Sequence, residues 1–271
     1  MPSSDPHAVN PQPRTGAYPQ PGNDVAVLAA NLAGVRARIA AAADRAGRDA
    51  SAIRLLAVSK TVPEDRIRLA VEAGCRELGE NKVQELARKH ANLADLDVSW
   101  SLIGHLQTNK ARDAAACADD FHALDSVRLA EALDRRLDVA GRSLAVYVQV
   151  NTSGEPSKFG LPPDDLVGFL SELTRFETLE VRGLMTLAAL DPDPERTRRC
   201  FALLRTLRDQ ARDHDPALIG PGELSMGMSG DFELAIEEGS TCVRVGQAIF
   251  GPRHLPDSHY WPEARDLTPG A

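Results

Sequence analysis

Short runs of β-branched and apolar residues alternate with longer segments of helical periodicity along most of the chain. Eight such apolar runs are present, at residues 53–60, 75–80, 98–105, 121–125, 144–151, 181–186, 223–228 and 242–250. Between them, the spacing of apolar positions predicts helices at residues 64–73, 82–93, 127–140, 164–176, 194–214 and 231–238, with a further helix before the first strand at residues 25–46. The pattern therefore predicts a protein of the α/β class.

Alternation of strand and helix predicts parallel strands, because each helix returns the chain to the end of the sheet where the next strand starts. Eight such units in a chain of 271 residues fit a single closed (β/α)8 TIM barrel, for which roughly 250 residues is typical. A doubly wound open sheet is the alternative, but no G-x-G-x-x-G motif follows the first strand. We therefore predict a barrel with an extra N-terminal helix.

The two ends of the chain differ from this middle part. Residues 1–23 are rich in proline, Ser, Asn, Gln and Gly, and such a composition buries too little apolar surface to offset the entropy lost on ordering. Residues 254–271 are again rich in proline and polar residues, although Tyr260 and Trp261 would allow docking on the body. We predict a disordered tail at 1–23, a barrel domain at 24–253 and a C-terminal extension at 254–271.

Composition and charge exclude several classes of protein. A net charge of −8 and a pI of about 5.4 argue against a nucleic-acid partner, whose phosphates require clustered Lys and Arg. The four cysteines form no C-x-x-C pair, so neither a metal site nor a redox dithiol is expected. The sequence also has no signal peptide and no run of about eighteen apolar residues. We expect a cytoplasmic protein with no membrane partner.

A lysine closes the first strand, in the segment LLAVSKT at residues 55–61. In a TIM barrel the C-terminal ends of the strands form the face that carries the active site. A lysine amine in a low-dielectric pocket has a depressed pKa and can form an imine with an aldehyde. Lys60 is therefore a candidate nucleophile, and a lysine snorkelling from a strand end is the alternative. Lys82, Lys89 and Lys110 have ordinary helix-surface explanations.

The second and third strands also end in polar residues. The segments are ELGENK at 77–82 and IGHLQTNK at 103–110. Asn81 and His105 are candidates for contact with an aromatic ring or its substituents, a role that the residues alone leave open. Glu80, Gln107 and Asn109 could equally cap the helices that follow, and a capping or loop role is the one we expect for Gln107 and Asn109.

The strongest signal for an anion lies between the seventh strand and the helix after it. The segment LSMGMSGD at 224–231 supplies hydroxyls, glycines that permit close approach, and the free N–H groups of a helix N-terminus, which favour a phosphate. Gly246, near the end of the eighth run, would bring a second backbone N–H to the same anion. Phosphate sites after strands seven and eight recur in this fold. Ordinary helix capping by Ser229 is the alternative.

Arg244 lies two residues before Gly246 on an otherwise apolar strand, so we expect its side chain to point into the barrel mouth. A buried, unpaired guanidinium is costly, and it therefore needs an acceptor. A pyridine nitrogen is one candidate, which a permanently charged arginine would keep unprotonated. An internal ion pair with Glu or Asp is the alternative.

Motifs in nearly every unit resemble the pyridoxal phosphate homeostasis protein family, roughly over residues 25–253. They are LLAVSK, GENKVQE, WSLIGHLQTNKAR, VNTSGEPSKFG, RGLMTL and LSMGMSGDFELAIEEGSTCVRVGQAIFG. The family is similar to the barrel domain of alanine racemase, a fold-type III architecture that binds pyridoxal 5′-phosphate (PLP). The resemblance implies a Schiff base between PLP and Lys60, Arg244 at the pyridine nitrogen and Asn81 near the ring. The remaining cofactor-binding residues that we carry over are Ser225, Ser229 and Gly246 around the phosphate, with Met226 and His105.

Racemases of this architecture use a tyrosine from a second domain as the acid or base opposite the lysine. This chain has only Tyr18, Tyr147 and Tyr260, two in the predicted tails and one in a predicted strand. We therefore hypothesise that PLP is carried and exchanged within the cell, with little or no racemisation. The alternatives are a PLP-dependent amino-acid racemase or lyase, and a barrel that binds another phosphorylated ligand without a covalent bond.

Lys158 lies in the segment PSKFG at 156–160, after the fifth strand. It is a candidate secondary site, either accepting PLP during transfer or pairing with the phosphate, although a loop lysine is more often solvated. The expected partners are PLP and apo PLP-dependent enzymes. We expect a monomer, because the family lacks the domain through which the racemase builds much of its dimer.

Overall fold

Eight parallel strands close into a barrel in the computed structural model, which describes residues 24–156, 158–188 and 193–252. The strands are β1 (Arg54–Val58), β2 (Glu77–Glu80), β3 (Ser99–Leu102), β4 (Asp120–Leu124), β5 (Leu144–Gln149), β6 (Leu179–Met185), β7 (Glu223–Met228) and β8 (Cys242–Val245). Each strand pairs with its neighbours in sequence, and β8 pairs with β1 to close the barrel. The (β/α)8 architecture expected from the sequence is therefore confirmed.

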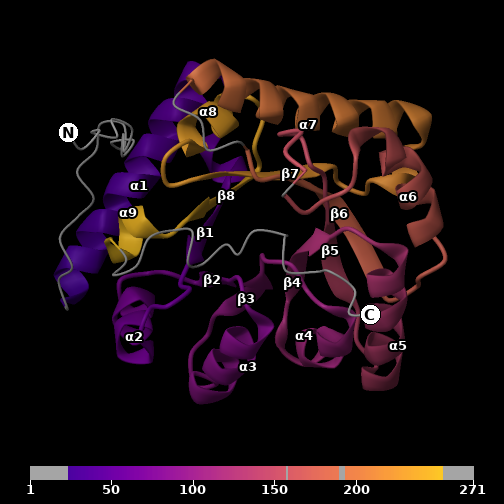
Figure 1. The fold of residues 1–271 in the computed structure, drawn as a ribbon. Helices are drawn as coiled ribbons and strands as arrows, with labels where there is room; N and C mark the ends of the chain where they lie inside the picture. Colours follow the sequence, from indigo (N-terminus) through magenta and orange to yellow (C-terminus); the bar gives the residue numbers. More distant parts are fainter. Residues whose placement is uncertain (1–23, 157, 189–192, 253–271) are drawn as a thin grey trace, which may run out of the picture.

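Helices surround the barrel on its outside (Figure 1). They are α1 (Val25–Arg45), α2 (Glu64–Glu72), α3 (Val83–Asn92), α4 (Ala111–Cys117), α5 (Val127–Ala140), α6 (Leu166–Leu173), α7 (Pro194–His214), α8 (Phe232–Glu237) and α9 (Gln247–Phe250). Within the described residues, four short 3-10 helices lie in the connections between helices and strands: η1 (Ala50–Ala52), η2 (Thr108–Lys110), η3 (Pro163–Asp165) and η4 (Pro216–Leu218). The predicted tail at 1–23 and extension at 254–271 lie outside the described residues.

The apolar pattern did not predict α4 or α9. The buried positions of α4 are three alanines and a cysteine, which give little apolar signal, and α9 has four residues, which is too short for a 3.6-residue repeat to be recognised. The apolar run at 242–250 was consequently taken for one strand, whereas β8 ends at Val245 and Gly246 starts a helical turn.

The extra helix α1 packs against the outside of the barrel beside α8 and α9. Its buried positions recur at helical spacing and are Leu28, Leu32, Val35, Ile39, Ala42 and Ala43. Beside these positions, Arg38 and Arg45 form ion pairs with Glu233 and Glu237 of α8. Among the described residues α1 also has the length and apolar composition of a membrane-spanning helix, a property that core helices share.

The barrel interior is polar at its N-terminal end. Arg54 at the start of β1 hydrogen-bonds to Glu77 and Asp120, at the starts of β2 and β4. Tyr147 of β5 donates a hydrogen bond to Glu223 at the start of β7. Above these groups lies a small apolar cluster made of Leu56, Val58, Ile103 and Cys242. Charges inside a barrel must be paired, so this layer closes the lower end and leaves the C-terminal mouth for a ligand.

Candidate functional site

Lys60 lies just beyond the C-terminal end of β1 and is 2% exposed. Side chains alternate along a strand, and Leu56 and Val58 belong to the cluster inside the barrel. Lys60 continues this series and therefore points into the barrel mouth. Asn81, which follows β2, is also buried, at 9% exposure. The structure thus brings both predicted residues to the C-terminal face.

Arg244 of β8 is buried inside the barrel, as its alternation with Gly246 predicted. Its Nη1 donates to Ser225 Oγ at 2.7 Å, and its Nη2 donates to the carbonyl oxygen of Thr186 at 2.8 Å. Neither acceptor is a carboxylate, so within the described part of the chain the alternative of an internal ion pair is wrong. Burial lowers the pKa of Arg244, and hydrogen bonds to neutral oxygens leave its positive charge available to a ligand.

The hydrogen bonds of Ser225 determine the tautomer of a buried histidine. Because a guanidinium only donates, Ser225 Oγ accepts from Arg244 and gives its own hydrogen to another acceptor. That acceptor is His122 Nδ1, 2.8 Å away. The proton of the neutral ring is then on Nε2, which lies 3.2 Å from Asp120 Oδ1 in a contact too bent for a full hydrogen bond. Ser225 therefore supports Arg244, and this geometry does not favour its predicted place at a phosphate.

His122 is held neutral by its surroundings. Burial is the main cause of its lowered pKa, which Arg244 and Arg54 lower further, while Asp120 opposes the shift. Burial would raise the pKa of Asp120, but the Arg54 guanidinium that donates to this carboxylate holds the pKa well below the usual range. The ring also packs against Tyr147, with centroids 4.1 Å apart. A neutral His122 completes the hydrogen-bond chain to Arg244 without adding charge.

This histidine gives the protein a measurable sensitivity to acid. As the pH falls through 6.5, His122 becomes protonated in the unfolded chain, whereas its buried ring stays neutral in the folded protein. The free energy of unfolding therefore decreases. Glu80 acts in the opposite sense, because burial raises its pKa to about 7. We therefore expect the His122→Asn variant to lose less stability than the wild type between about pH 7.5 and 5.5, by up to about 1.4 kcal/mol per pH unit. Urea unfolding across this range measures the two slopes, and equal slopes would contradict a neutral buried ring.

Ser229, which follows β7, and Gly246, which follows β8, were both predicted to contact an anion, and they lie side by side. The Gly246 N–H donates to Ser229 Oγ at 3.2 Å. Asp231, not Ser229, precedes α8, and its Oδ1 accepts the Met228 N–H at 2.5 Å, which closes the loop after β7. The capping alternative for Ser229 is therefore wrong. Its hydroxyl and the Gly246 amide form one polar corner of the mouth.

Met226 lies on the other face of β7. Its side chain is buried in the main hydrophobic core, whereas Ser225 points inside the barrel. Gly227 follows with a φ of 95°, and a Cβ there would lie 2.6 Å from the Cβ of Ala235, so α8 packs closely on the strand end. Only the backbone of Met226 can therefore face the mouth, and a side-chain role at the cofactor is not supported.

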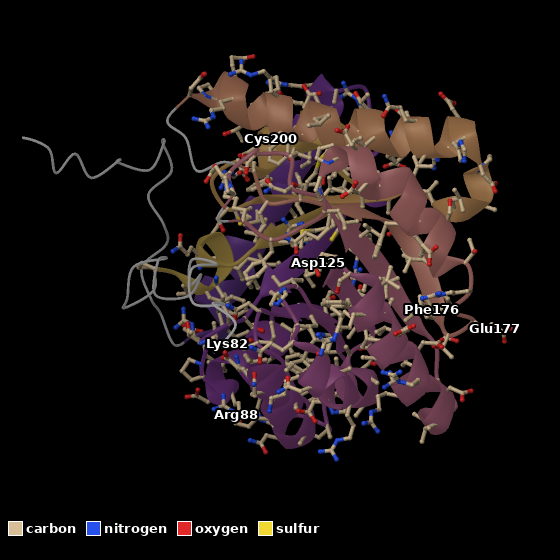
Figure 2. All side chains as sticks on the ribbon, turned by 45° about the vertical axis from the view of Figure 1, so that its right-hand side comes forward. Lys82, Arg88, Asp125, Phe176, Glu177 and Cys200 are labelled. Atoms are coloured by element: carbon tan, nitrogen blue, oxygen red, sulfur yellow. The ribbon has the colours of Figure 1, made fainter. Side chains whose placement is uncertain are left out.

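His105 and Lys158 both lie at the rim of the mouth, and the contact between their segments is made by Phe159, the residue after Lys158. The His105 ring stacks on Phe159, with centroids 4.0 Å apart and an interplanar angle of 11°, and its Nδ1 lies 3.7 Å from Asp125, which Figure 2 labels. Lys158 Nζ donates to the carbonyl oxygen of Ala188 at 3.0 Å and pairs with Glu155 at 3.1 Å. Lys158 is thus hydrogen-bonded to the segment that follows β6.

Near Lys60, the expectation for Lys89 is wrong, and the structure rules out one possibility left open for Glu80. Lys89 was expected on a helix surface but has a fully buried side chain, and Glu80 caps no helix but pairs with it at 2.8 Å. Lys82, in contrast, is exposed at the start of α3 (Figure 2). Gln107 and Asn109 are both exposed; Gln107 precedes η2 but its side chain makes no capping hydrogen bond, and Asn109 lies within η2.

Sequence reasoning did not single out the contacts of four residues: His122 with Ser225, Thr186 with Arg244, Glu85 with the Thr61 N–H, and Lys89 with the Ser59 carbonyl oxygen. A signal for Lys89 was present, because Val83, Leu86 and Lys89 share the buried face of α3. His122 alternates with Asp120 along β4, which places it inside the barrel, although its partner on β7 could not be read from this pattern.

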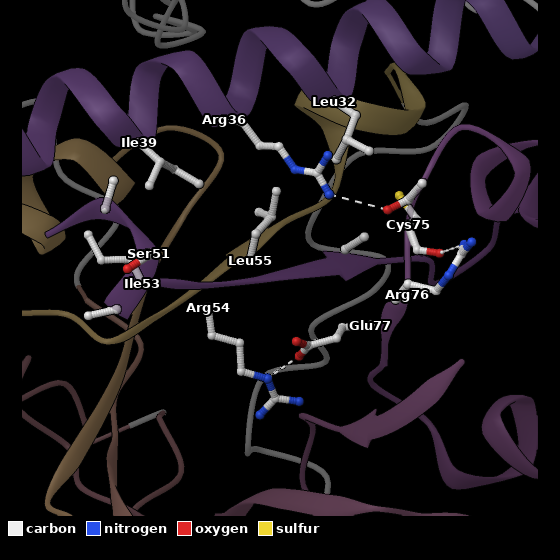
Figure 3. Close-up of a pocket in the computed structure, with 14 residues that line it drawn as sticks. Leu32, Arg36, Ile39, Ser51, Ile53, Arg54, Leu55, Cys75, Arg76 and Glu77 are labelled. Atoms are coloured by element: carbon white, nitrogen blue, oxygen red, sulfur yellow. Dashed lines mark hydrogen bonds and ion pairs between the residues drawn. The ribbon is translucent and has the colours of Figure 1, made fainter. Parts of the chain in front are cut away.

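Two surface cavities lie at opposite ends of the barrel. One, of about 620 Å³, lies beside α1 at the N-terminal ends of β1 and β2 (Figure 3). The guanidinium groups that line it are engaged, since Arg36 donates to a carbonyl oxygen and Arg54 pairs with Glu77. The other, of about 580 Å³, lies at the C-terminal face, between Thr61 and the start of α3. Active sites of this fold occupy the C-terminal face, which excludes the first cavity.

Among the described residues, no group of three His, Cys, Asp or Glu side chains is arranged to hold a metal ion. The four cysteines are buried and unpaired with one another. Burial raises the pKa of Cys242, inside the barrel, to about 12, so this thiol stays protonated.

Comparisons of this chain with a family model and with known proteins all indicate the same family. Residues 30–254 match the family described as alanine racemase, N-terminal domain. The chain is 42% identical over 229 residues to the pyridoxal phosphate homeostasis protein of Pseudomonas aeruginosa, covering 84% of this chain and 97% of that protein. It is 41% identical to the protein of the same name from Aquifex aeolicus, covering 82% and 96%.

Comparison with solved structures indicates the same fold. PipY of Synechococcus elongatus PCC7942, with PLP bound, superposes with a TM-score of 0.74 and 40% identity, covering 83% of this chain and all of that one. Alanine racemase from Corynebacterium glutamicum gives a TM-score of 0.64 at 20% identity, covering 86% of this chain and 64% of that one. At that identity the racemase shares the fold alone.

Proposed function

Because the chain belongs to the pyridoxal phosphate homeostasis protein family, we propose that it holds PLP as a Schiff base on Lys60 and acts in PLP homeostasis as a carrier or buffer. One observation carries the proposal: a buried lysine amine lies at the mouth of a barrel whose fold and sequence match a relative solved with PLP bound. The racemase alternative is treated below.

The residues at the mouth fit the chemical groups of PLP. Lys60 supplies an amine, and Ser229 with the Gly246 amide supplies hydrogen-bonding groups for a phosphate at the ends of β7 and β8. Arg244 supplies a fixed positive charge inside the barrel. These groups come from three adjacent strands, β7, β8 and β1. PLP carries an aldehyde that can form an imine with this amine, and a phosphorylated ligand without an aldehyde cannot form that bond.

Each residue acts in a definable way. Lys60 supplies the primary amine that forms an imine with an aldehyde. Ser225 and Thr186 hold Arg244 in place, and its permanent charge opposes protonation of any nitrogen that it faces. When bound, PLP supplies the aldehyde for the lysine and an aromatic electron sink, whose capacity an unprotonated ring limits. The site is therefore suited to holding the cofactor more than to carbanion chemistry.

The experiment is a titration of the purified protein with PLP. We expect a visible absorption band, which borohydride reduction removes while adding the mass of the reduced cofactor to the peptide that contains Lys60. A preparation that stays colourless with added PLP and gains no mass would overturn the proposal.

A racemase would need a second acid or base facing Lys60. Tyr147 is unsuited to this role, because it lies inside the barrel, bonds to Glu223, and has a pKa raised by burial. It is the only tyrosine among the described residues, since Tyr18 and Tyr260 lie outside them. We expect turnover of amino acids at least about 1000-fold below that of a racemase, because general acid–base catalysis contributes 10²–10⁴-fold. A chiral assay of alanine and other amino acids measures this, and racemase-like turnover that requires Lys60 would favour the alternative.

We further propose that the protein is a cytoplasmic monomer that exchanges PLP with apo PLP-dependent enzymes. The names of the relatives support a role in homeostasis. Activation of an apo-enzyme by the loaded protein, faster than by the same amount of free PLP, would establish direct delivery. Equal rates would reduce the role to buffering.

A further inference from the structure

A fully buried lysine, Lys89, lies behind the strand end that carries Lys60. It projects from α3 toward the ends of β1 and β2, and its three ammonium hydrogens meet three acceptors. Its Nζ lies 2.7 Å from the carbonyl oxygen of Ser59, 2.8 Å from Glu80 Oε1 and 2.8 Å from Glu85 Oε1. Glu80, Glu85 and Lys89 are called the Lys89 cluster below.

The Lys89 cluster holds both peptide groups that flank Lys60. On one side, Lys89 donates to the carbonyl oxygen of Ser59. On the other side, the Thr61 N–H donates to Glu85 Oε1 at 2.8 Å. The backbone of Lys60 is therefore anchored before and after the residue by side chains of α3, a helix that lies outside the barrel.

Thr61 needs such an anchor because its backbone lies in the left-handed region, with a φ of 64°. It is the one non-glycine residue with a positive φ in the described part of the chain. For a β-branched residue this conformation is unfavourable, because Cβ approaches the following carbonyl oxygen. A strained backbone persists where the surrounding structure over-determines it, and such strain is concentrated at functional sites.

Stability alone does not account for the Lys89 cluster. Glu80 is fully buried, and burial raises its pKa to about 7 even though Lys89 and Ser59 stabilise the carboxylate. Its Oε2 has no hydrogen-bond partner within the described residues. Apolar side chains of similar volume often stabilise such a layer as well as buried ions do. What apolar side chains cannot do is hold the two peptide groups beside Lys60.

We infer that Glu85 and Lys89 are positioning residues for Lys60, which hold the left-handed turn at Thr61 and so aim the Lys60 amine at the barrel mouth. The inference rests on the proposed function of Lys60. Glu85 is the residue to change, because its side chain is 19% exposed while Lys89 and Glu80 are 0% exposed, so its removal disturbs the core least.

The first test is the Glu85→Ala variant. It removes the acceptor of the Thr61 N–H, and we expect the dissociation constant for PLP, from titration of the visible band, to rise about tenfold, as for the loss of one hydrogen bond to a charged group. Gln84→Ala is the matched control, because Gln84 is exposed on the same helix and lines the same cavity. We expect this control to bind PLP like the wild type.

A double variant separates positioning from stability. Glycine adopts a positive φ without the steric cost of Cβ, so Thr61→Gly in the Glu85→Ala background should recover at least about threefold of the lost affinity. If Glu85 served stability alone, releasing the strain at Thr61 would return no affinity, and that result overturns the inference.

Amide hydrogen exchange in the protein without PLP gives a readout independent of the cofactor. We expect the Thr61 amide to exchange about tenfold faster in Glu85→Ala than in the wild type or Gln84→Ala. If the wild type forms no imine with PLP, the proposed function fails while this measurement still tests the turn. Unchanged exchange at Thr61, unchanged PLP affinity, or an equal loss in Gln84→Ala each overturns the inference.

Discussion

The Lys60→Ala variant is expected to show no visible band with PLP and no gain of mass at this position after borohydride reduction. The loss is complete because a Schiff base requires a primary amine, and alanine has none. Contacts with Ser229 and Gly246 would remain, so weak non-covalent binding of PLP should survive. Absorbance titration and peptide mass mapping measure the two components separately.

Lys82→Ala is the control for the loss of a lysine at the same face, because Lys82 is exposed at the start of α3. It should form the band and the adduct like the wild type. Circular dichroism must show that Lys60→Ala is folded, since the substitution empties a buried site. An undiminished adduct in folded Lys60→Ala would contradict the assignment, and an adduct mapped to Lys158 would give that lysine the accepting role considered from the sequence.

The Gly104→Ala variant is expected to lose both stability and PLP affinity. A Cβ at this position would lie 2.2 Å from the carbonyl oxygen of Asn81, and backbone atoms cannot rotate away as a side chain does. The segments after β2 and β3 must separate, at a cost of roughly 1–3 kcal/mol or more. Asn81 follows β2 directly and lies two residues before Val83, where α3 begins, so the displacement changes the mouth itself. Urea unfolding and PLP titration measure the two effects.

Gly34→Ala provides a control of the opposite sign. Gly34 lies within α1, and a Cβ there meets no atom within 4 Å. Alanine in a helix interior is more favourable than glycine by roughly 0.5–1 kcal/mol, so this variant should be slightly more stable and bind PLP normally. If Gly104→Ala were as stable as the wild type, the close approach of the two segments would not constrain the site.

The fold could be predicted because hydrophobic periodicity is a local property. Strands and helices of this chain repeat with periods that a window of a few residues reveals, as the bounds of α5 and α7 illustrate. The small buried side chains of α4 give little apolar signal, and the four residues of α9 are too few to show a period. The same limit led the eighth apolar run to be taken for a single strand.

The candidate site could be predicted only as far as strand ends and faces. Lys60, Asn81 and Arg244 were placed correctly at the mouth or inside the barrel, because alternation along a strand gives the face. Alternation also puts Ser225 and Met226 on opposite faces of β7, so treating both as cofactor contacts overlooked a signal that the sequence contained.

By itself, then, the sequence determined the barrel, the face of each strand residue and the lysine at the mouth, since each follows from the order of neighbouring residues. Only the tertiary structure decided which side chains meet. His122 and Ser225 are 103 residues apart, and Lys89 lies 30 residues from Ser59. Such partners are fixed by the register and closure of the barrel, which no local period encodes. The support behind Arg244 and the anchoring of Lys60 therefore became visible only in the folded chain.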